Sequence, residues 1–352
     1  MSQMNTINSE KIYRFNTMLE SAEKIVIATH MKPDGDAVGS SMGMYHTLKL
    51  YGKSAKITFT NPAPASISFL TEGYEDILTY EHAKDETERA ILEADLIICM
   101  DFNAFHRTDT LQDVLTRSEA EKVLIDHHLA PDLESFSLVF TETEISSASE
   151  LLYHVLMELP AVGGDAKRLP LEAATAIMTG MTTDTNNFMN STYPSTLRMA
   201  SSLLEAGVDR DMIIQNVYNS FKEGRIRLQG YVLKDLLNIT QDGVAYIILN
   251  KETIEKYNIQ EGDTEGFVNI PLSIKGVLMS IFIKEDADRV RVSIRSRKGT
   301  SANRCAKRFF NGGGHENAAG GRLYMPQDIS SINDAAEYIE RVTHIFMNEE
   351  ND

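Results

Sequence analysis

Cysteine is scarce in this chain, and long apolar runs are absent. Two cysteines, Cys99 in an apolar run and Cys305 in a predicted helix, cannot build a disulfide framework and are expected to be packing residues in a reducing compartment. No apolar stretch is long enough to cross a bilayer, and no charged-then-apolar leader is evident at the start. We therefore expect a cytoplasmic protein that does not associate with membranes.

Basic residues are also in the minority. The chain has 34 lysines and arginines against 51 aspartates and glutamates, a net charge of −17, which disfavours non-specific binding of long nucleic acid. Positive charge is nevertheless concentrated near the C-terminus, where one acid, Glu316, accompanies Arg289, Arg291, Arg295, Arg297, Lys298, Arg304, Lys307, Arg308 and Arg322. This distribution fits a small anionic ligand held at one place better than a polymer track.

The 352 residues are enough for two domains, each with its own core. In the first half, apolar strand-like runs alternate with helical segments, which is typical of βαβ units and a mainly parallel α/β sheet. We predict strands at 25–28, 53–60, 95–101, 122–128 and 136–141, and helices at 8–22, 37–50, 85–94, 110–117, 146–159 and 171–181.

The later part of the chain changes in pattern. Residues 194–237 look almost wholly helical, with Gly207 as a break. Strands are predicted at 244–249, 277–283 and 289–297, and helices at 253–257, 302–310 and 332–347. We therefore expect a Rossmann-like first domain at 1–190, a helical connector at 191–240 and a smaller α/β domain at 241–352.

Polar side chains follow the apolar elements of the first domain. We group these side chains as strand-end residues, and they are His30, Asp34, Asp36, Asp101, Asp126, His127, His128 and Asp184. The carboxyl ends of parallel strands are where such sheets usually build ligand sites. Oxygen ligands mixed with imidazole and free of thiolate suit manganese or magnesium better than structural zinc. Two divalent ions would relieve the carboxylate repulsion and could support a phosphoryl displacement.

Each of these motifs also has a plainer explanation. Asp34 and Asp36 could form a solvated turn, and His128 could pack, because adjacent strand residues point to opposite sides. Two further candidates, Arg107 after the Asp101 strand and the glycines at 312–314 in the basic segment, are treated the same way. Arg107 could be a surface arginine, and the glycines could form only a tight turn. The other histidines are expected to be surface or packing residues: His46, His82, His106, His154 and His344.

The ordered motifs resemble those of the DHH phosphoesterase superfamily over nearly the whole chain. They are His30-x-x-Pro33-Asp34-x-Asp36-x-x-Gly39-Ser40, Asp101 with Arg107, Asp126-His127-His128, and Thr183-Asp184-Thr185. A fifth motif, Gly312-Gly313-Gly314-His315, resembles the glycine-rich turn of the DHH-associated domain. Ordered motifs are far more specific than one short pattern. Size and layout are similar to the NrnA type of bifunctional oligoribonuclease and pAp phosphatase.

The resemblance implies a role for each site residue. His30, Asp34 and Asp101 would hold one metal ion, and Asp36, Asp101, His127 and Asp184 the other, with Mn²⁺ preferred and Mg²⁺ as the alternative. His128 would contact the scissile phosphate or help to protonate the leaving oxygen, and Asp126 would orient the histidines from behind. Arg107 would contact the substrate. Asn186 stands where the family often has glycine, which leaves the conformation of that turn open.

The second domain would select short substrates. Backbone N–H groups of the glycine-rich turn can surround a phosphate, and Arg295, Arg297 and His315 could add charged hydrogen bonds. If a terminal phosphate or nucleotide is gripped there, only the nearby ester reaches the metals.

The resemblance therefore implies a hydrolase that degrades short oligonucleotides, or nanoRNA, to mononucleotides and dephosphorylates pAp to AMP. It leaves open a cyclic dinucleotide phosphodiesterase or one acting on linear pApA, and it is compatible with a homodimer. An alternative from another functional class is a nucleotide-binding regulator with an inactive metal centre. Such a protein should have lost at least one metal ligand, and all of them are present in this sequence. Pyrophosphatases that share these metal motifs have a different second domain, so the glycine-rich turn with His315 argues against them. RecJ-type exonucleases are larger and carry an added nucleic-acid-binding module, for which this chain has no room.

Overall fold

The computed structural model describes residues 7–260, 262–286 and 289–350, which form two compact units that divide between Ser220 and Phe221. The division falls inside the segment 191–240, so two of its α-helices belong to the first unit, and a third α-helix with a short π-helix belongs to the second. Within the described ranges, no helix combines the length and apolar character needed to span a membrane.

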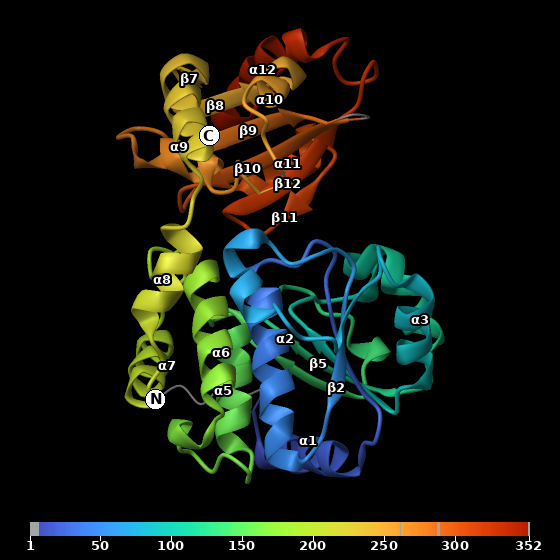
Figure 1. The fold of residues 1–352 in the computed structure, drawn as a ribbon. Coiled ribbons are helices and arrows are strands. Elements are labelled where there is room, and N and C mark those ends of the chain that lie inside the picture. The colour runs from blue at the N-terminus through green and yellow to red at the C-terminus, as the bar shows by residue number, and fades with distance from the viewer. Residues whose placement is uncertain (1–6, 261, 287–288, 351–352) are drawn as a thin grey trace. The chain divides into compact units, whose positions relative to one another are not determined.

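The first unit is built on a six-stranded sheet in the order β3-β2-β1-β4-β5-β6. All of its neighbouring strands are parallel, which confirms the predicted parallel α/β architecture. The strands are β1 (Ile25–Thr29), β2 (Ala55–Phe59), β3 (Ile77–Thr79), β4 (Leu96–Met100), β5 (Glu121–Asp126) and β6 (Leu138–Thr141). The helices are α1 (Ser9–Ser21), α2 (Gly35–Thr47), α3 (Lys84–Glu93), α4 (Gln112–Arg117), α5 (Ala148–Glu158), α6 (Leu171–Asp184), α7 (Pro194–Glu205) and α8 (Arg210–Tyr218). Figure 1 shows β2 and β5 of this sheet between α3 on one side and α2, α5 and α6 on the other.

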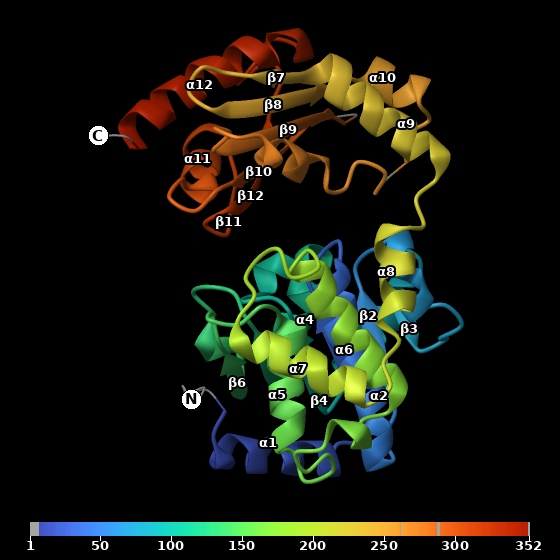
Figure 2. The ribbon, with the colours of Figure 1, turned by 90° about the vertical axis from the view of Figure 1, so that its left-hand side faces the viewer.

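The strands of this sheet are buried on both faces. Successive side chains point to opposite faces of a strand, so Ile25 and Ile27 join one core with residues of α1, α2, α5 and α6, while Val26 and Ala28 join a second core with residues of α3 and α4. Figure 2 shows α5, α6 and α7 together on one side of the sheet. Burial on both faces explains why these strands appear as continuous apolar runs in the sequence.

The strand order reverses between β1 and β4. From β1 the chain proceeds outward through β2 and β3, and it then returns to place β4 on the other side of β1. In open parallel sheets, ligands bind beyond the carboxyl ends of the strands at such a reversal. The His30 loop follows β1 and the Asp101 loop follows β4, so both lie at this point.

Helices α2 and α6 pack closely through small residues. A Cβ atom added at Gly39 would lie 2.6 Å from the Ala176 carbonyl oxygen and 2.7 Å from the Gly180 backbone. One added at Gly35 would lie 2.2 Å from Thr183 Oγ1. These contacts bring the end of α6 beside the start of α2.

The second unit contains a mixed six-stranded sheet in the order β11-β12-β10-β9-β8-β7, in which β8 and β9 are parallel and the other neighbours antiparallel. Its strands are β7 (Leu237–Ile239), β8 (Val244–Leu249), β9 (Met279–Glu285), β10 (Val290–Ser296), β11 (Gly313–Gly314) and β12 (Ala318–Leu323). Its helices are α9 (Glu223–Tyr231), α10 (Lys251–Lys256), α11 (Ala302–Phe309) and α12 (Ala335–Glu350). One core lies against α11 and α12, and a smaller one includes residues of α9.

Three strands of this unit differ from the prediction, and one of them, β11, is formed by Gly313 and Gly314 of the glycine-rich turn. β7 lies at the end of a segment that was expected to be helical, and β12 was not predicted; it contains Gly320 and Gly321, and glycine is depleted in strands. Gly321 is required, because a Cβ there would lie 2.3 Å from the Phe310 carbonyl oxygen. Gly320 is only tolerated, because the nearest backbone atom to a Cβ there is in ordinary contact at 3.7 Å. Close approach of α11 therefore favours glycine in this strand.

Candidate metal centre

Seven of the eight grouped side chains come from the edge of the first sheet or the helix that starts there. His30 follows β1, Asp101 follows β4, and Asp126 ends β5, with His127 and His128 directly after it. Asp34 and Asp36 lie at the start of α2. Asp184 differs from the expectation of a strand end, because it is the last residue of helix α6. It reaches the same region through the close packing of α6 against α2.

The ligand atoms of these residues form three groups, within each of which the atoms lie no more than 4.8 Å apart. The groups are His30, Asp34 and Asp101; Asp36, His127 and Asp184; and Asp101, His127 and His128. Asp101 Oδ2 lies 3.4 Å from His30 Nε2, and its Oδ1 lies 3.4 Å from His127 Nε2. The carboxylate of Asp101 thus faces a histidine of each of the first two groups.

Asp101 has a left-handed backbone conformation. Its φ of 62° lies in the left-handed region, which few residues other than glycine, asparagine and aspartate adopt readily. Its backbone N–H donates to the Ile125 carbonyl at 3.1 Å, which ties the end of β4 to β5. This conformation, held by the bond to β5, directs the carboxylate between His30 and His127.

Asp36 is fixed by the N-terminus of another helix. Its carboxylate accepts hydrogen bonds from the backbone N–H groups of Ala148, at 2.6 Å, and Ser149, at 2.9 Å, which begin α5. These N–H groups have no partner within their own helix and favour a negative charge. Asp34 is exposed and caps α2 by accepting from the N–H groups of Asp36 and Ala37, as a plain turn would, but its carboxylate also lies in one group with His30 and Asp101.

Hydrogen bonds at Nδ1 orient two histidines. His30 Nδ1 lies 2.9 Å from the Met31 carbonyl oxygen, which makes Nδ1 the donor and directs the Nε2 lone pair toward the carboxylates. His128 Nδ1 lies 2.7 Å from Asp126 Oδ1, and Asp126 is completely buried. Because β5 ends at Asp126, His128 is not turned away from the site, and its ring meets that of His127 edge-on at a centroid separation of 4.8 Å.

The electrostatics of the cluster favour a cation. Burial and the neighbouring carboxylates Asp101 and Asp184 raise the pKa of Asp36 well above its usual range. Burial also opposes the charge on Asp101, but His127 and His30 hold the pKa of Asp101 well below its usual range. Asp101 and Asp34 outweigh burial and raise the pKa of His30 to about 9. Asp101, Asp184 and Asp36 outweigh burial at His127 and raise its pKa to about 10. Without a metal, therefore, protons on the histidines balance part of the acid charge.

The residues present fit a divalent metal. Asp101 Oδ1 is buried and, within the described ranges, no donor meets it with hydrogen-bond geometry, so it has an unused lone pair directed at the group. Carboxylate oxygens and imidazole nitrogens are ligands for manganese or magnesium, and a buried carboxylate oxygen that makes no hydrogen bond is costly. The donor chemistry and the orphaned oxygen point to the same conclusion.

Two further residues of the predicted motifs lie close by. The Met31 N–H donates to the Arg107 carbonyl at 2.8 Å, which attaches the Arg107 segment to the loop that carries His30. Asn186 has a φ of 46°, followed by 57° at Asn187 and 67° at Phe188. The turn that follows Asp184 is therefore left-handed, and asparagine can replace glycine there because it tolerates this region.

The glycine-rich turn of the second unit is shaped by backbone contacts. A Cβ at Gly312 would lie 1.9 Å from the Gly320 carbonyl oxygen, and Gly314 has a φ of 151°. The N–H of Gly312 donates to Ala306, that of Gly314 to Asn303 Oδ1 and that of His315 to Ala318. These groups are thus engaged within the unit, which shifts any role in phosphate binding toward nearby side chains.

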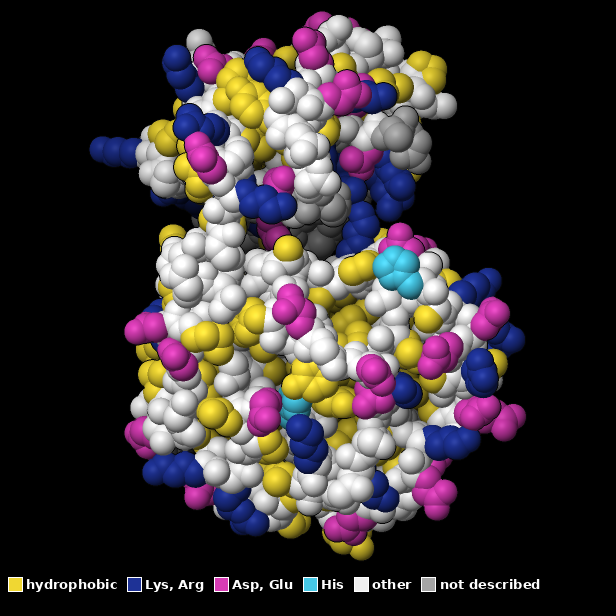
Figure 3. Space-filling model, viewed as in Figure 1, with side chains coloured by type: hydrophobic (Ala, Val, Ile, Leu, Met, Phe, Trp, Pro, Cys, Tyr) yellow, Lys and Arg dark blue, Asp and Glu magenta, His cyan; other side chains and the backbone are white. Residues whose placement is uncertain are grey.

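The basic side chains predicted to bind phosphate are partly engaged as well. Arg297 donates to the Leu272 carbonyl at 2.6 Å, and Arg295 donates to the Ile294 carbonyl at 3.0 Å. Arg295 pairs with Ala318 across β10 and β12, which places it beside the turn that contains His315. On the face shown in Figure 3, the charged side chains of the first unit are of mixed sign, without a continuous basic track among the residues drawn in colour.

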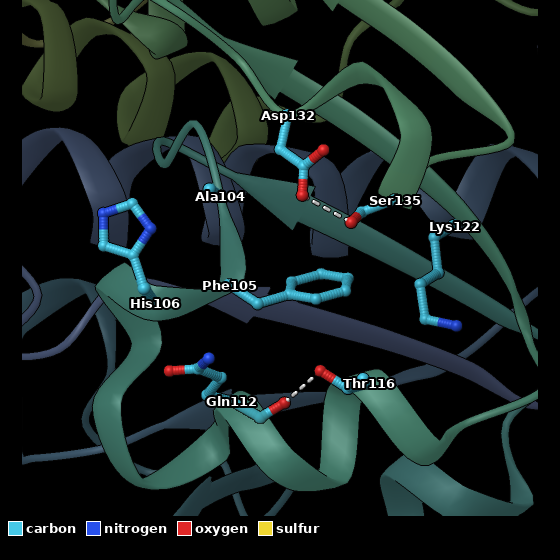
Figure 4. Close-up of a pocket in the computed structure, with 8 residues that line it drawn as sticks. All are labelled: Ala104, Phe105, His106, Gln112, Thr116, Lys122, Asp132 and Ser135. Atoms are coloured by element: carbon cyan, nitrogen blue, oxygen red, sulfur yellow. Dashed lines mark hydrogen bonds between the residues drawn. The ribbon is translucent and has the colours of Figure 1, made fainter.

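A pocket of about 310 Å³ lies beside α4 in the first unit, lined by Ala104, Phe105, His106, Gln112, Thr116, Lys122, Asp132 and Ser135 (Figure 4). None of the residues grouped as metal ligands lines it. The Lys122 ammonium donates to the carbonyls of Ser118 and Ala120. The pocket is therefore separate from the metal cluster.

Sequence reasoning missed the donors that hold Asp36. Ala148 and Ser149 are 112 and 113 residues away from Asp36 in the chain, so no local pattern indicates the contact. One signal was present: Ser147 to Glu150 form an S-x-x-E pattern, which marks a helix start whose N–H groups are available.

Comparison with known proteins agrees with this geometry. Residues 24–181 match the DHH family, N-terminal domain, and residues 236–341 match the DHHA1 domain. A bifunctional oligoribonuclease and PAP phosphatase NrnA of Bacillus subtilis is 28% identical over 313 residues, 88% of this chain and 92% of that protein. A probable bifunctional oligoribonuclease and PAP phosphatase NrnA of Streptococcus mutans is 31% identical over 321 residues, 88% of this chain and 94% of that protein.

A solved structure is similar over the full length. An exopolyphosphatase-related protein from Bacteroides fragilis has a TM-score of 0.91 at 38% identity, covering 99% of this chain and 100% of that one. The sequence and structural matches confirm the predicted resemblance. The chain belongs to the DHH family, in its NrnA branch, with a DHHA1 domain in its second unit.

Proposed function

We propose that this protein is a metal-dependent phosphoesterase that degrades short oligoribonucleotides to mononucleotides and dephosphorylates pAp to AMP. The observation that carries the proposal is the position of Asp101, whose two carboxylate oxygens lie 3.4 Å from His30 Nε2 and His127 Nε2. The names of the NrnA relatives support the choice of substrates.

The cluster is proposed to hold two divalent ions, with Mn²⁺ preferred. His30, Asp34 and Asp101 would hold one, and Asp36, Asp101, His127 and Asp184 the other. Two such ions supply an activated water at neutral pH and neutralise charge on the phosphate. An intact set of candidate ligands argues against a nucleotide-binding regulator with a dead metal centre.

His128 is proposed to act on the phosphoryl group. Its Nδ1 faces Asp126, so Nε2 is the atom through which a neutral imidazole accepts a proton or a protonated one donates to the leaving oxygen. Asp126 accepts two hydrogen bonds from His128, one from Nδ1, which orients the ring, and one from the backbone N–H. Arg107 is proposed to contact the substrate, since its segment is joined to the His30 loop.

The second unit is proposed to bind the nucleotide end distant from the scissile ester. Arg295 and His315 lie on neighbouring parts of β10 and the turn before β12, and they could contact a terminal phosphate. Arg297 and Gly312 to Gly314 would shape this site. Binding one end of the substrate in this way would favour short chains over long ones.

A substrate panel tests the proposal. Purified protein with Mn²⁺ is incubated separately with pAp, a 5′-phosphorylated RNA dinucleotide, a 24-nucleotide RNA and a cyclic dinucleotide, and initial rates are compared. We expect the dinucleotide and pAp to be hydrolysed, the long RNA far more slowly, and EDTA to abolish each reaction. Turnover of the cyclic compound alone would instead identify a cyclic dinucleotide phosphodiesterase, and no turnover at all would support a regulator.

A further inference from the structure

The start of helix α5 determines where one candidate metal ligand lies. Asp36 is 1% exposed, and its two carboxylate oxygens accept from the N–H groups of Ala148 and Ser149. Gly180 of α6 leaves room for this contact, because a Cβ there would lie 2.0 Å from Ser149 Oγ and 3.0 Å from Asp36 Oδ1. Any displacement of the first turn of α5 would therefore move Asp36 or break its hydrogen bonds.

A second carboxylate, Glu150, fixes that turn from behind. Glu150 is completely buried, and its Oε2 accepts from the Ser146 N–H at 3.1 Å and the Ser146 hydroxyl at 2.5 Å. The same oxygen accepts from the Thr196 hydroxyl at 2.6 Å, which reaches it from helix α7. One oxygen thus joins the segment before α5 to the first turn of α7.

The connection continues toward Asp184. Thr196 Oγ1 also accepts the Tyr193 N–H at 3.1 Å, at the end of the segment that leads from Asp184 through the left-handed turn into α7. We propose that Glu150 is a positioning residue for the group Asp36, His127 and Asp184, and leaves the group His30, Asp34 and Asp101 unaffected. The proposal rests on the proposed function, because it concerns one of the two ion sites.

The plainer explanation is a helix cap. Ser147 Oγ accepts the Glu150 N–H at 2.9 Å, as in a capping box, and a cap stabilises a helix without affecting any ligand. Two features exceed that role. The carboxylate is buried and reaches a different helix, and hydrogen bonds from His154, Ser146 and Thr196 outweigh burial to lower the pKa of Glu150 to about 2. Glu150 is therefore a shared acceptor for the segment that leads into the donors of Asp36 and for helix α7, which follows Asp184 in the chain.

Calorimetric titration of Mn²⁺ into the full-length, metal-free protein tests the proposal, together with thermal melting. The variants are Glu150→Ala, which removes the acceptor, and Glu150→Gln, which keeps one acceptor oxygen. Asn8→Ala is the matched control, because it removes an N-cap from α1 far from the site along the chain. We expect two Mn²⁺ ions in the wild type, a loss of at least tenfold in the affinity of one of them in Glu150→Ala, and recovery of most of that affinity in Glu150→Gln.

The control separates positioning from capping. Asn8→Ala should lower the melting temperature yet bind both ions as the wild type does. Two unchanged affinities in Glu150→Ala would overturn the proposal and leave a plain cap. If Glu150→Ala does not fold, Thr196→Val removes the hydroxyl that joins Glu150 to α7 and accepts the Tyr193 N–H, while Ser146 still donates to Glu150. Wild-type affinities in that variant would overturn the proposal equally. A wild type that binds no Mn²⁺ would instead remove the proposed function itself.

Discussion

Asp126 Oδ1 lies 2.7 Å from His128 Nδ1, and Asp126 Oδ2 accepts the backbone N–H of the same histidine at 3.1 Å. Asp126→Asn replaces this acceptor with an amide that can donate to Nδ1, which favours the tautomer with its proton on Nε2. We expect kcat to fall by roughly 10²–10⁴-fold with little change in KM. Steady-state kinetics with Mn²⁺ and an RNA dinucleotide measure both. A loss of Mn²⁺ binding in this variant would place Asp126 among the ligands instead.

Asp101→Asn tests the shared ligand without disturbing the backbone. Asparagine tolerates the left-handed φ of 62° as well as aspartate does, so the variant should fold normally. The neutral amide would weaken both ion sites, and we expect kcat/KM to fall by at least roughly a hundredfold. Mn²⁺ titration and circular dichroism accompany the kinetics. Undiminished hydrolysis with Mn²⁺ present would contradict the shared-ligand assignment.

Replacing Gly39 and Gly224 by alanine should change the free energy of unfolding in opposite directions. Both lie in helices, but a Cβ at Gly39 meets the backbone of α6 at 2.6 to 2.7 Å, whereas at Gly224 nothing lies within 4 Å. We expect Gly39→Ala to lower the free energy of unfolding by roughly 1–3 kcal/mol and Gly224→Ala to raise it by roughly 0.5–1 kcal/mol. Urea titrations of the two variants decide this. A neutral Gly39→Ala would mean that α2 and α6 can separate without cost.

His46 should make the metal-free protein sensitive to mild acid. It is 2% exposed against the rings of Tyr45 and Tyr74, and burial, with a smaller effect of Lys49 and an opposing one of Glu172, lowers its pKa to about 4. A depressed histidine pKa means that stability is complete above about pH 6.5 and is lost as the pH falls toward 4. The loss can reach about 3 kcal/mol.

The measurement is urea unfolding in EDTA at pH 7 and pH 5. His46→Phe should remove much of the difference between the two pH values, since phenylalanine has no proton to bind. His82→Gln changes an exposed histidine and should leave the difference unchanged. Equal pH dependence in all three proteins would show that His46 does not titrate in this range.

The elements that the sequence predicted best are those whose side chains are buried on both faces. The apolar runs that contain β1, β4 and β5 have no other plausible place in a folded chain, and each ends at a candidate ligand. The prediction was less successful where glycine dominates, as in β12, because backbone approach there depends on a neighbouring helix. Asp184 was grouped with the strand ends but ends helix α6. Its place at the site also depends on a neighbouring helix, and a helix that ends near a ligand has no distinctive local pattern.

The residues behind the ligands could not be predicted at all. Asp36 meets the start of α5 across more than a hundred residues, and Glu150 appears in the sequence as an ordinary capping residue. Only the packed structure shows that Thr196 and Ser146 share its carboxylate. Sequence motifs thus indicated which residues bind, while the reasons for their positions lie in tertiary contacts.

The reversal of strand order also has a consequence for the order of folding. β1 and β4 pair in register from Ile25 with Leu96 to Thr29 with Met100, so the chain must close a long loop before His30 can approach Asp101. Parallel pairings of such high contact order form slowly. A metal ion that needs ligands from both strands would then bind only the completed sheet, and by mass action it would stabilise that state against unfolding without guiding the chain toward it.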